Sequence, residues 1–207
     1  RPTHKSRQFE KDMYETCHHK YAALTDGRNG IAVLNDCKFG ISAQDSRLSL
    51  TLLKAPVMPD MQADMGEHEV SYALYLFEGP FQNSDVPKKG YEYNLEPTVA
   101  QVEMAESDAT QTNKGASSFF QIESPSVMID TCKPAMDMEN GVVLRLYEYM
   151  GSAVDAKLYV PDEVQRIFTA NMLEDKISEL QIQKEGKKLY VEFDLGAFEI
   201  QTLLLEV

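Results

Sequence analysis

Apolar and polar positions alternate with a period of two in the clearest segments of this chain. Over residues 70–76, Val70, Tyr72, Leu74 and Leu76 fall on one face, because successive side chains of an extended strand point in opposite directions. A regular alternation of this kind predicts a β-strand rather than a helix, whose apolar positions recur every three to four residues.

The C-terminal half repeats the pattern. Val142, Leu144 and Leu146 share one face of a predicted strand, whereas Arg145 lies on the other. The polar, glycine-containing segment 184–187 predicts the turn of a hairpin. After it, the alternation runs twice around Gly196, through Leu189, Val191, Phe193 and Leu195, and then through Phe198, Ile200, Thr202 and Leu204.

Helical signals are few and short. The best covers residues 162–168, where Pro161 and Asp162 provide a start signal. Because strand patterns outweigh this one short helix, the sequence predicts an all-β fold.

One polar segment divides the chain. Residues 106–118 contain no aliphatic side chain larger than that of alanine and are rich in Ser, Thr, Asn and Gly. We expect a linker or exposed loop there. It separates a first β unit, residues 1–105, from a second, residues 119–207.

Charge narrows the range of partners. The chain of 207 residues has 33 acidic and 20 basic residues and a formal charge of −13. Such a surface repels nucleic acid and anionic membranes and suits neutral or cationic ligands. No apolar run approaches the roughly 18 residues of a membrane span, so we expect neither a nucleic-acid nor a membrane partner.

The cysteines and the first residues suggest a compartment. Cys17, Cys37 and Cys132 are odd in number and have no metal-type spacing, which favours buried or idle thiols in a reducing cytoplasm over one disulfide and a free thiol. The chain opens on Arg1 without a leader or an initiator methionine. We therefore expect a cytoplasmic protein and a piece of a longer chain.

Three motifs in the first unit combine strands with turns: G-I-A-V-L-N-D-C-K-F-G (30–40), L-S-L-T-L-L-K-A-P-V-M-P-D (48–60) and A-D-M-G-E-H-E-V-S-Y-A-L (63–74). Together with R-P-T-H at the start, they resemble the C-terminal β-region of family 38 glycoside hydrolases, the class II α-mannosidases. Residues 14–24, 124–149 and 197–207 extend the resemblance in the expected order.

The resemblance implies a β-sandwich architecture in two parts. Residues 1–105 would be the later part of a large, galactose-mutarotase-like supersandwich, and residues 119–207 a small terminal β-sandwich. Strands of the first part would then lack native neighbours. Exposed edges of that kind predict self-association into homo-oligomers.

The resemblance also implies a longer parent enzyme, a retaining α-mannosidase that hydrolyses terminal α-mannosyl linkages of oligosaccharides. In that family two carboxyl groups and a divalent metal, usually zinc, act in an N-terminal α/β barrel. No barrel motif is present in this sequence. We therefore expect neither catalytic nor metal-binding residues in this chain, no activity of the chain alone, and the barrel of the same protein as its partner.

One turn of this β-region reaches the sugar site in the family, and residues 35–40 match it. The resemblance implies that Asn35, Asp36 and Lys38 bind a mannose-containing oligosaccharide, although some members have Arg where this chain has Cys37 and Lys38. An Asx turn that closes a hairpin explains the same residues without a ligand. Both interpretations stay open.

Other polar groups have structural explanations beside functional ones. His18 and His19 are adjacent, so we expect them on opposite sides of a strand, one buried and hydrogen-bonded and one in solvent. Asp64 and His68 belong to a cluster that predicts cap and turn groups or, alternatively, a weak calcium site. The other members of that cluster are Asp60 and Glu67.

Two larger sets of residues, one charged and one of tyrosines, also allow a structural and a functional explanation. Charged residues around strand 142–149 predict a network that joins strands or binds the rest of the enzyme; they are Asp130, Lys133, Asp137, Glu139 and Arg145. Tyrosines on predicted strands offer either a sugar-stacking platform or half-buried packing; they are Tyr72, Tyr75, Tyr147, Tyr149, Tyr159 and Tyr190.

A second hypothesis is a non-catalytic carbohydrate-binding or assembly module. It predicts a sugar affinity that belongs to this chain and depends on surface tyrosines and carboxylates. The enzyme-fragment hypothesis predicts almost no such affinity without the barrel.

Overall fold

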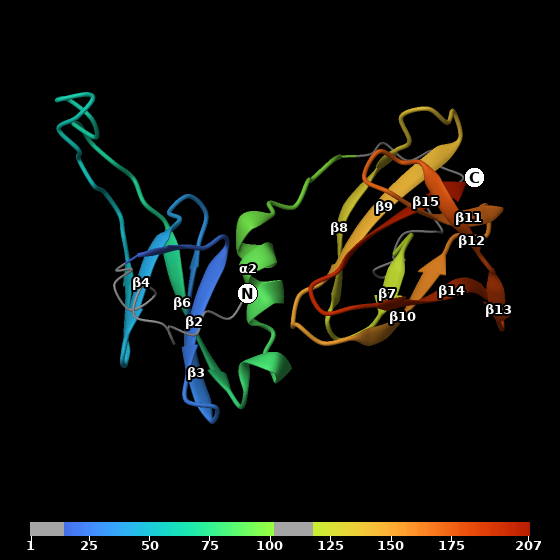
Figure 1. Ribbon diagram of the computed structural model, residues 1–207, viewed down its shortest axis with the longest axis horizontal. Helices are drawn as coiled ribbons and strands as arrows, with labels where there is room; N and C mark the ends of the chain where they lie inside the picture. Colours follow the sequence, from blue (N-terminus) through green and yellow to red (C-terminus); the bar gives the residue numbers. More distant parts are fainter. Residues whose placement is uncertain (1–14, 102–117) are drawn as a thin grey trace. The chain divides into compact units, whose positions relative to one another are not determined.

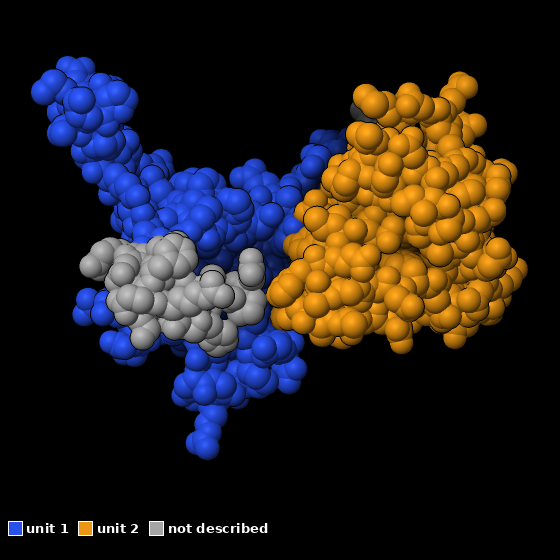
Figure 2. Space-filling view, viewed as in Figure 1, with its two compact units in different colours: residues 1–101 blue, residues 102–207 orange. Residues whose placement is uncertain are grey.

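The computed structural model describes residues 15–101 and 118–207. Strands dominate both ranges, which confirms the predicted all-β fold. The chain divides into two compact units, residues 1–101 (unit 1) and residues 102–207 (unit 2), coloured separately in Figure 2. The predicted linker 106–118 lies, apart from its last residue, outside the described residues.

Unit 1 contains two antiparallel sheets of three strands, ordered β1-β4-β5 and β2-β3-β6. Their bounds, with those of a 3₁₀ turn and a helix, are β1 (Thr16–Cys17), β2 (Tyr21–Thr25), β3 (Asn29–Asn35), β4 (Gly40–Gln44), β5 (Arg47–Leu50), β6 (Tyr72–Glu78), η1 (Phe81–Asn83) and α2 (Val86–Asn94). Helix α2 packs on the second sheet (Figure 1), where a small core unites Ala32, Leu34, Phe77 and Val86.

The sequence pattern did not predict helix α2. Its residues are polar on average, and Gly90 in its middle weakens a helical signal, although Pro87 in the first turn is compatible with a helix start. Packing explains Gly90, because a Cβ there would lie 2.7 Å from Cδ1 of Tyr21 on β2. The helix forms where this close contact with the sheet stabilises it.

Strand β6 shows the predicted alternation but turns the predicted face outward. Ala73, Tyr75 and Phe77 pack toward the core below α2. On the other face, Leu74 and Leu76 are 64% and 74% exposed. Residues 51–71 between β5 and β6 form an extended arm without strands (teal in Figure 1). Its apolar side chains Val57, Met58, Met61 and Met65 are also exposed.

Unit 2 is a β-sandwich, as predicted. Its four-stranded sheet has the order β13-β14-β10-β7, and its five-stranded sheet has the order β12-β11-β15-β9-β8. The strands are β7 (Gln121–Glu123), β8 (Val127–Pro134), β9 (Gly141–Glu148), β10 (Val154–Val160), β11 (Arg166–Ala170), β12 (Lys176–Leu180), β13 (Gln183–Glu185), β14 (Lys188–Leu195) and β15 (Ile200–Glu206).

The core of unit 2 lies between these sheets. Leu144 and Leu146 of β9 point into it, which confirms the faces predicted for this strand. On β15 the residues in this core are Leu203 and Leu205. Leu204 instead belongs to a smaller cluster with Val143, Phe168 and Ala170 on β9 and β11.

The prediction of a helix over residues 162–168 is wrong. A single turn, in which the Val164 amide donates to the Pro161 carbonyl, leads directly into β11. There Ile167 pairs with Leu205 of β15 and Leu180 of β12. Short isolated helices are marginal in water, and hydrogen bonds to two neighbouring strands outweigh this start signal.

A buried carboxylate, which the sequence analysis did not single out, fixes one end of unit 2. Glu148 is 1% exposed and accepts hydrogen bonds from the amides of Met150, Gly151 and Phe198 at 2.7–3.0 Å. Burial by itself would raise the pKa of Glu148, but these hydrogen bonds outweigh it and leave the pKa below its ordinary value. The carboxylate thereby joins the turn after β9 to the turn before β15.

Candidate functional site

The turn between β3 and β4 is held by a buried asparagine. Asn35 has no exposed surface, and its Nδ2 donates to Nε2 of His18 at 2.7 Å. Its Oδ1 accepts from the backbone amide of Lys38 at 2.8 Å, which is the geometry of an Asx turn. The Asn35 carbonyl in turn accepts from Nδ2 of Asn94 in α2 at 3.1 Å. The turn is therefore anchored both to His18, which follows β1, and to the helix.

His18 has a defined proton arrangement in this anchor. Its Nδ1 lies 3.1 Å from the carbonyl oxygen of Phe39, which can only accept, so Nδ1 carries the proton and Nε2 accepts from Asn35. Burial lowers the pKa of His18, and the charge of His19 lowers it further. The hydrogen bond to Phe39 acts in the opposite direction, but the net effect is a lowered pKa. The neutral imidazole is thus the form that holds the turn. His19 is exposed and His18 is hydrogen-bonded, as predicted, but His18 is only partly buried, and neither histidine lies in a strand, because β1 ends at Cys17.

The three predicted substrate-binding residues have different surroundings. Asp36 is exposed and Lys38 is partly exposed, so both side chains are accessible in this chain. Asn35 is buried, and both atoms of its amide are already bonded. Cys37 is exposed between them, and the hydrogen bond with Asp36 raises the pKa of its thiol, which keeps it protonated at neutral pH.

Lys38 also lines an open cavity of about 390 Å³ in unit 1. We call it the Glu15 cavity; its polar side chains are Glu15, Lys38, Thr51, Lys54, Asp64 and His68. Leu52, Leu53 and Pro56 add an aliphatic wall. Lys38 and His68 are 30 positions apart in the sequence and line one cavity only in the folded unit.

Most of the cluster in the arm holds the arm together. Oδ2 of Asp64 accepts from the Ala55 amide at 3.0 Å, and Nε2 of His68 donates to the Asp64 carbonyl at 2.9 Å. Oδ1 of Asp60 accepts from the amide of Gln62 at 2.9 Å. The predicted cap and turn roles of Asp60, Asp64 and His68 are confirmed.

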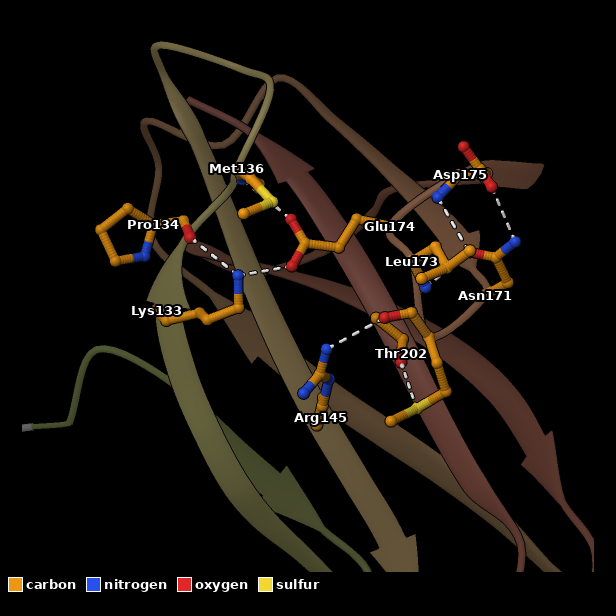
Figure 3. A network of polar contacts seen from close by, with 10 residues as sticks. Lys133, Pro134, Met136, Arg145, Asn171, Leu173, Glu174, Asp175 and Thr202 are labelled. Carbon is orange, nitrogen blue, oxygen red and sulfur yellow. Dashed lines mark hydrogen bonds and ion pairs between the residues drawn. The ribbon is translucent and has the colours of Figure 1, made fainter.

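The charged residues of unit 2 form a local network (Figure 3). Lys133 on β8 is ion-paired with Glu174, whose other oxygen accepts from the Met136 amide at 2.9 Å. Arg145 donates to the Met172 carbonyl at 3.2 Å. The predicted inter-element network is thus confirmed for Lys133 and Arg145, with partners in the 171–175 loop that the sequence pattern did not indicate.

The tyrosines form separate pairs rather than one platform. The rings of Tyr159 and Tyr190 are 6.0 Å apart, and Nζ of Lys157 lies 4.0 Å from the centroid of Tyr190. The Tyr147 and Tyr149 rings meet edge to face at 6.3 Å. Packing and cation–π contacts therefore account for these rings.

Within residues 15–101 and 118–207, no group of three or more His, Cys, Asp or Glu side chains is placed to hold a metal ion. The described side chains therefore do not fit the zinc site that the resemblance implies for the parent enzyme. The same part of the chain contains no helix with the length and apolarity to cross a membrane.

Comparison with known proteins identifies the family and agrees with the sandwich. Residues 1–62 match the glycosyl hydrolases family 38 C-terminal domain, and residues 126–203 match the glycosyl hydrolases family 38 C-terminal beta sandwich domain. The chain belongs to the C-terminal region of glycosyl hydrolase family 38. The turn at Asn35 and the Glu15 cavity lie in the first matched part, except for Asp64 and His68.

Relatives of this family 38 chain are much longer than the chain itself. It is 37% identical to alpha-mannosidase 2C1 of Homo sapiens and 31% identical to alpha-mannosidase G of Dictyostelium discoideum. These alignments cover 99% and 98% of this chain but 19% and 18% of the relatives. The chain thus spans about a fifth of the length of the curated relatives that it matches.

A solved structure supports the fold. An alpha-mannosidase from Enterococcus faecalis V583 superposes with a TM-score of 0.70 at 18% identity, over 100% of this chain and 23% of that chain. At this identity the similarity concerns the fold alone.

Proposed function

We propose that this chain is the C-terminal β part of a retaining α-mannosidase that hydrolyses terminal α-mannosyl linkages of oligosaccharides. In this proposal residues 1–105 are the end of the large sandwich domain and residues 119–207 the terminal domain. The observation that carries the proposal is the anchored turn at Asn35, which exposes Asp36 and places Lys38 in the lining of the Glu15 cavity. The relatives named alpha-mannosidase give the substrate class.

The chemistry itself is assigned to the longer protein. Retention requires a nucleophilic carboxylate and an acid–base carboxyl about 5–5.5 Å apart, and we propose that an N-terminal barrel supplies both, together with a divalent metal, zinc by preference. Within this chain, Asp36 and Lys38 would hydrogen-bond to sugar hydroxyls. Asn35 would position them through its bonds to His18 and Lys38, without touching the sugar.

The exposed apolar surface of unit 1 supports a role as scaffold. Tyr72, Leu74 and Leu76 form an uncovered sheet face on β6, which soluble proteins rarely leave in water. We propose that the upstream part of the longer protein covers it. In the isolated chain a second copy would take that place, so homo-oligomers are expected of the isolated chain.

We further propose a cytoplasmic location. The three thiols support it: Cys17, Cys37 and Cys132 are free and exposed, a combination that suits a reducing compartment. Of the predicted buried or idle thiols, the exposure of all three leaves the idle kind. Locating a fluorescent fusion of the full-length gene product in cells would test this assignment.

Hydrolysis of a chromogenic α-mannoside tests the proposed function. The full-length gene product should be active and lose activity with a chelator, whereas the chain alone should be inactive. Asp36→Ala and Lys38→Ala should each lower kcat/KM by about 10-fold to 100-fold, because hydrogen bonds to charged groups contribute about 1.5–3 kcal/mol. Asp194→Ala and Lys187→Ala, at exposed positions of unit 2, are matched controls.

The alternative function is a non-catalytic carbohydrate-binding or assembly module. The uncovered face of β6 favours the assembly role, because such a surface can dock a partner without any chemistry. An inactive full-length protein with and without added zinc would support this alternative. Activity of the chain alone that resists a chelator would contradict both proposals.

A further inference from the structure

The arm at residues 51–71 has a shape that its own hydrogen bonds maintain. Oδ2 of Asp64 accepts from the Ala55 amide at 3.0 Å, which ties the two halves of the arm together across nine positions. The Met65 amide donates to the Gln62 carbonyl at 3.2 Å, so the end of the arm is a closed turn. With this shape the arm extends away from the sheets of unit 1 (Figure 1).

The end of the arm exposes a cluster of apolar side chains. Its members, which we call the apolar tip, are Val57, Met58, Met61 and Met65, with exposed fractions of 67%, 77%, 75% and 73%. Apolar surface is stabilised when it leaves water, and soluble proteins rarely leave a contiguous cluster of this kind uncovered. Unbranched methionines adapt to the contour of a partner, and methionine is enriched in protein interfaces. The tip therefore has the composition of a docking surface.

Charge narrows what can cover the apolar tip. Residues 51–71 contain one lysine and four carboxylates, which are Asp60, Asp64, Glu67 and Glu69. Two such arms would repel each other, and the chain as a whole has a formal charge of −13, so a second copy is disfavoured at the tip. A surface that fits has an apolar hollow for the tip and basic side chains around it, since opposite charges pair across the rim of an interface.

The arm is continuous with the face of β6 that we propose the longer protein covers. It leads directly into this strand, whose exposed side chains include Leu74 and Leu76. The chain matches only 19% and 18% of two relatives, so most of each relative lies outside the matched part. We propose that the arm docks on the upstream part of the longer protein, with its apolar tip in an apolar hollow that has a basic rim. The existence of that upstream part rests on the proposed function.

Oxidation of methionines by hydrogen peroxide tests the docking, because the rate follows the exposure of the thioether. In the full-length gene product, Met58, Met61 and Met65 should react at least about 10-fold more slowly than free methionine added to the same solution. Peptide mass spectrometry measures each methionine separately. Rates within about 2-fold of free methionine would overturn the docking. Protection that disappears on dilution would also overturn it, because a second copy would then cover the tip.

Charge reversal tests the basic rim. Glu67→Lys in the full-length protein should raise the oxidation rate of Met61 at least about 5-fold, because the rim would then repel the arm. Glu192→Lys, at an exposed position of β14, is the matched control and should leave this rate unchanged. If Glu67→Lys perturbs folding, Met58→Gln, which removes apolar contact without adding charge, should instead accelerate oxidation of Met65. Protection that neither variant reduces would overturn the docking.

The docking and the proposed function fail in different ways. Protected tip methionines in a full-length protein that does not hydrolyse α-mannosides would contradict the proposed function and support the docking. Reactive tip methionines in an active full-length protein would overturn the docking and leave the proposed function intact.

Discussion

Unit 2 has a large core between two sheets, whereas unit 1 has a small core below α2 and exposes one face of β6 and the arm. Both units consist of antiparallel strands with similar alternation, so the strand pattern alone does not explain the difference. Its origin is the number of layers, since a sheet needs a second layer to bury its other face. By this criterion unit 2 covers the inner faces of its two sheets, whereas Leu74 and Leu76 on one face of β6 stay exposed in the described part of unit 1.

The strongest test of this comparison truncates one leucine in each unit. Leu144→Ala should lower the free energy of unfolding of unit 2 by about 3–4 kcal/mol, because Leu144 is fully buried. In the isolated chain, at concentrations low enough to keep it monomeric, Leu76→Ala should change the stability of unit 1 by less than about 0.5 kcal/mol, because Leu76 is exposed. Urea unfolding followed by NMR signals of each unit measures both.

Leu76→Ala also tests whether another part of the longer protein covers the exposed face of β6. In the longer protein, where we propose that β6 is covered, Leu76→Ala should cost about 2 kcal/mol. Equal effects in the isolated chain and in the longer protein would show that the face of β6 remains in solvent.

Glu148→Ala should have the next largest effect, a loss of about 2–3 kcal/mol in unit 2. The change leaves the partly buried amides of Met150, Gly151 and Phe198 without this acceptor. Thermal unfolding of this variant and of Glu192→Ala, at an exposed position of β14, provides the comparison. Similar melting temperatures for both variants would contradict the role of Glu148 in joining the two turns.

Asn35→Ala should lower the stability of unit 1 by about 2 kcal/mol, because Nε2 of His18 and the amide of Lys38 lose their partner. Faster hydrogen exchange at the Lys38 amide would report the loss locally. Asn83→Ala, at an exposed position of η1, is the control. An unchanged Lys38 amide would mean that the turn keeps its shape without the asparagine.

The smallest effect we expect is a difference in acid sensitivity. The pKa of His18 is lowered by folding, so its contribution to stability is complete above the unfolded value of about 6.5 and decreases as the pH falls below it. The pKa of Glu148 is also lowered, so its contribution persists above about 4.3 and decreases only as the pH falls through its folded value.

As the pH is lowered, the Lys38 amide should therefore lose its protection from hydrogen exchange first. The Gly151 amide should lose its protection only at lower pH. Asn35→Asp would sharpen this result, because a carboxylate beside His18 favours the protonated imidazole and should raise its pKa. Simultaneous loosening of both amides, at any pH, would contradict separate titration of the two anchors.

Local alternation predicted the strands and could not predict what lies opposite them. It gave the correct faces of β9, because Leu144 and Leu146 alternate with charged and aromatic residues. On β6 both faces are apolar, so the pattern could not distinguish the face below α2 from the one that is exposed. Helix α2 was not predicted, because contact with Tyr21 stabilises it rather than local helix propensity.

The candidate site shows the same division. The turn residues were identifiable from a short motif, but the Glu15 cavity joins residues from four separate segments. The buried state of Asn35 depends on His18 and Asn94, which lie 17 and 59 positions away. No local pattern predicts such pairings.

The sequence by itself determined the all-β class, the sandwich of unit 2, the resemblance to family 38 and the turn at residues 35–40. These follow from periodicity and short motifs, in which each residue constrains its neighbours along the chain. The tertiary structure decided that Asn35 supports the turn while Asp36 and Lys38 remain accessible, and that Glu15 meets Lys38 and Lys54 in one cavity. Burial and polar pairing depend on distances through space, which the chain fixes only when its strands have paired.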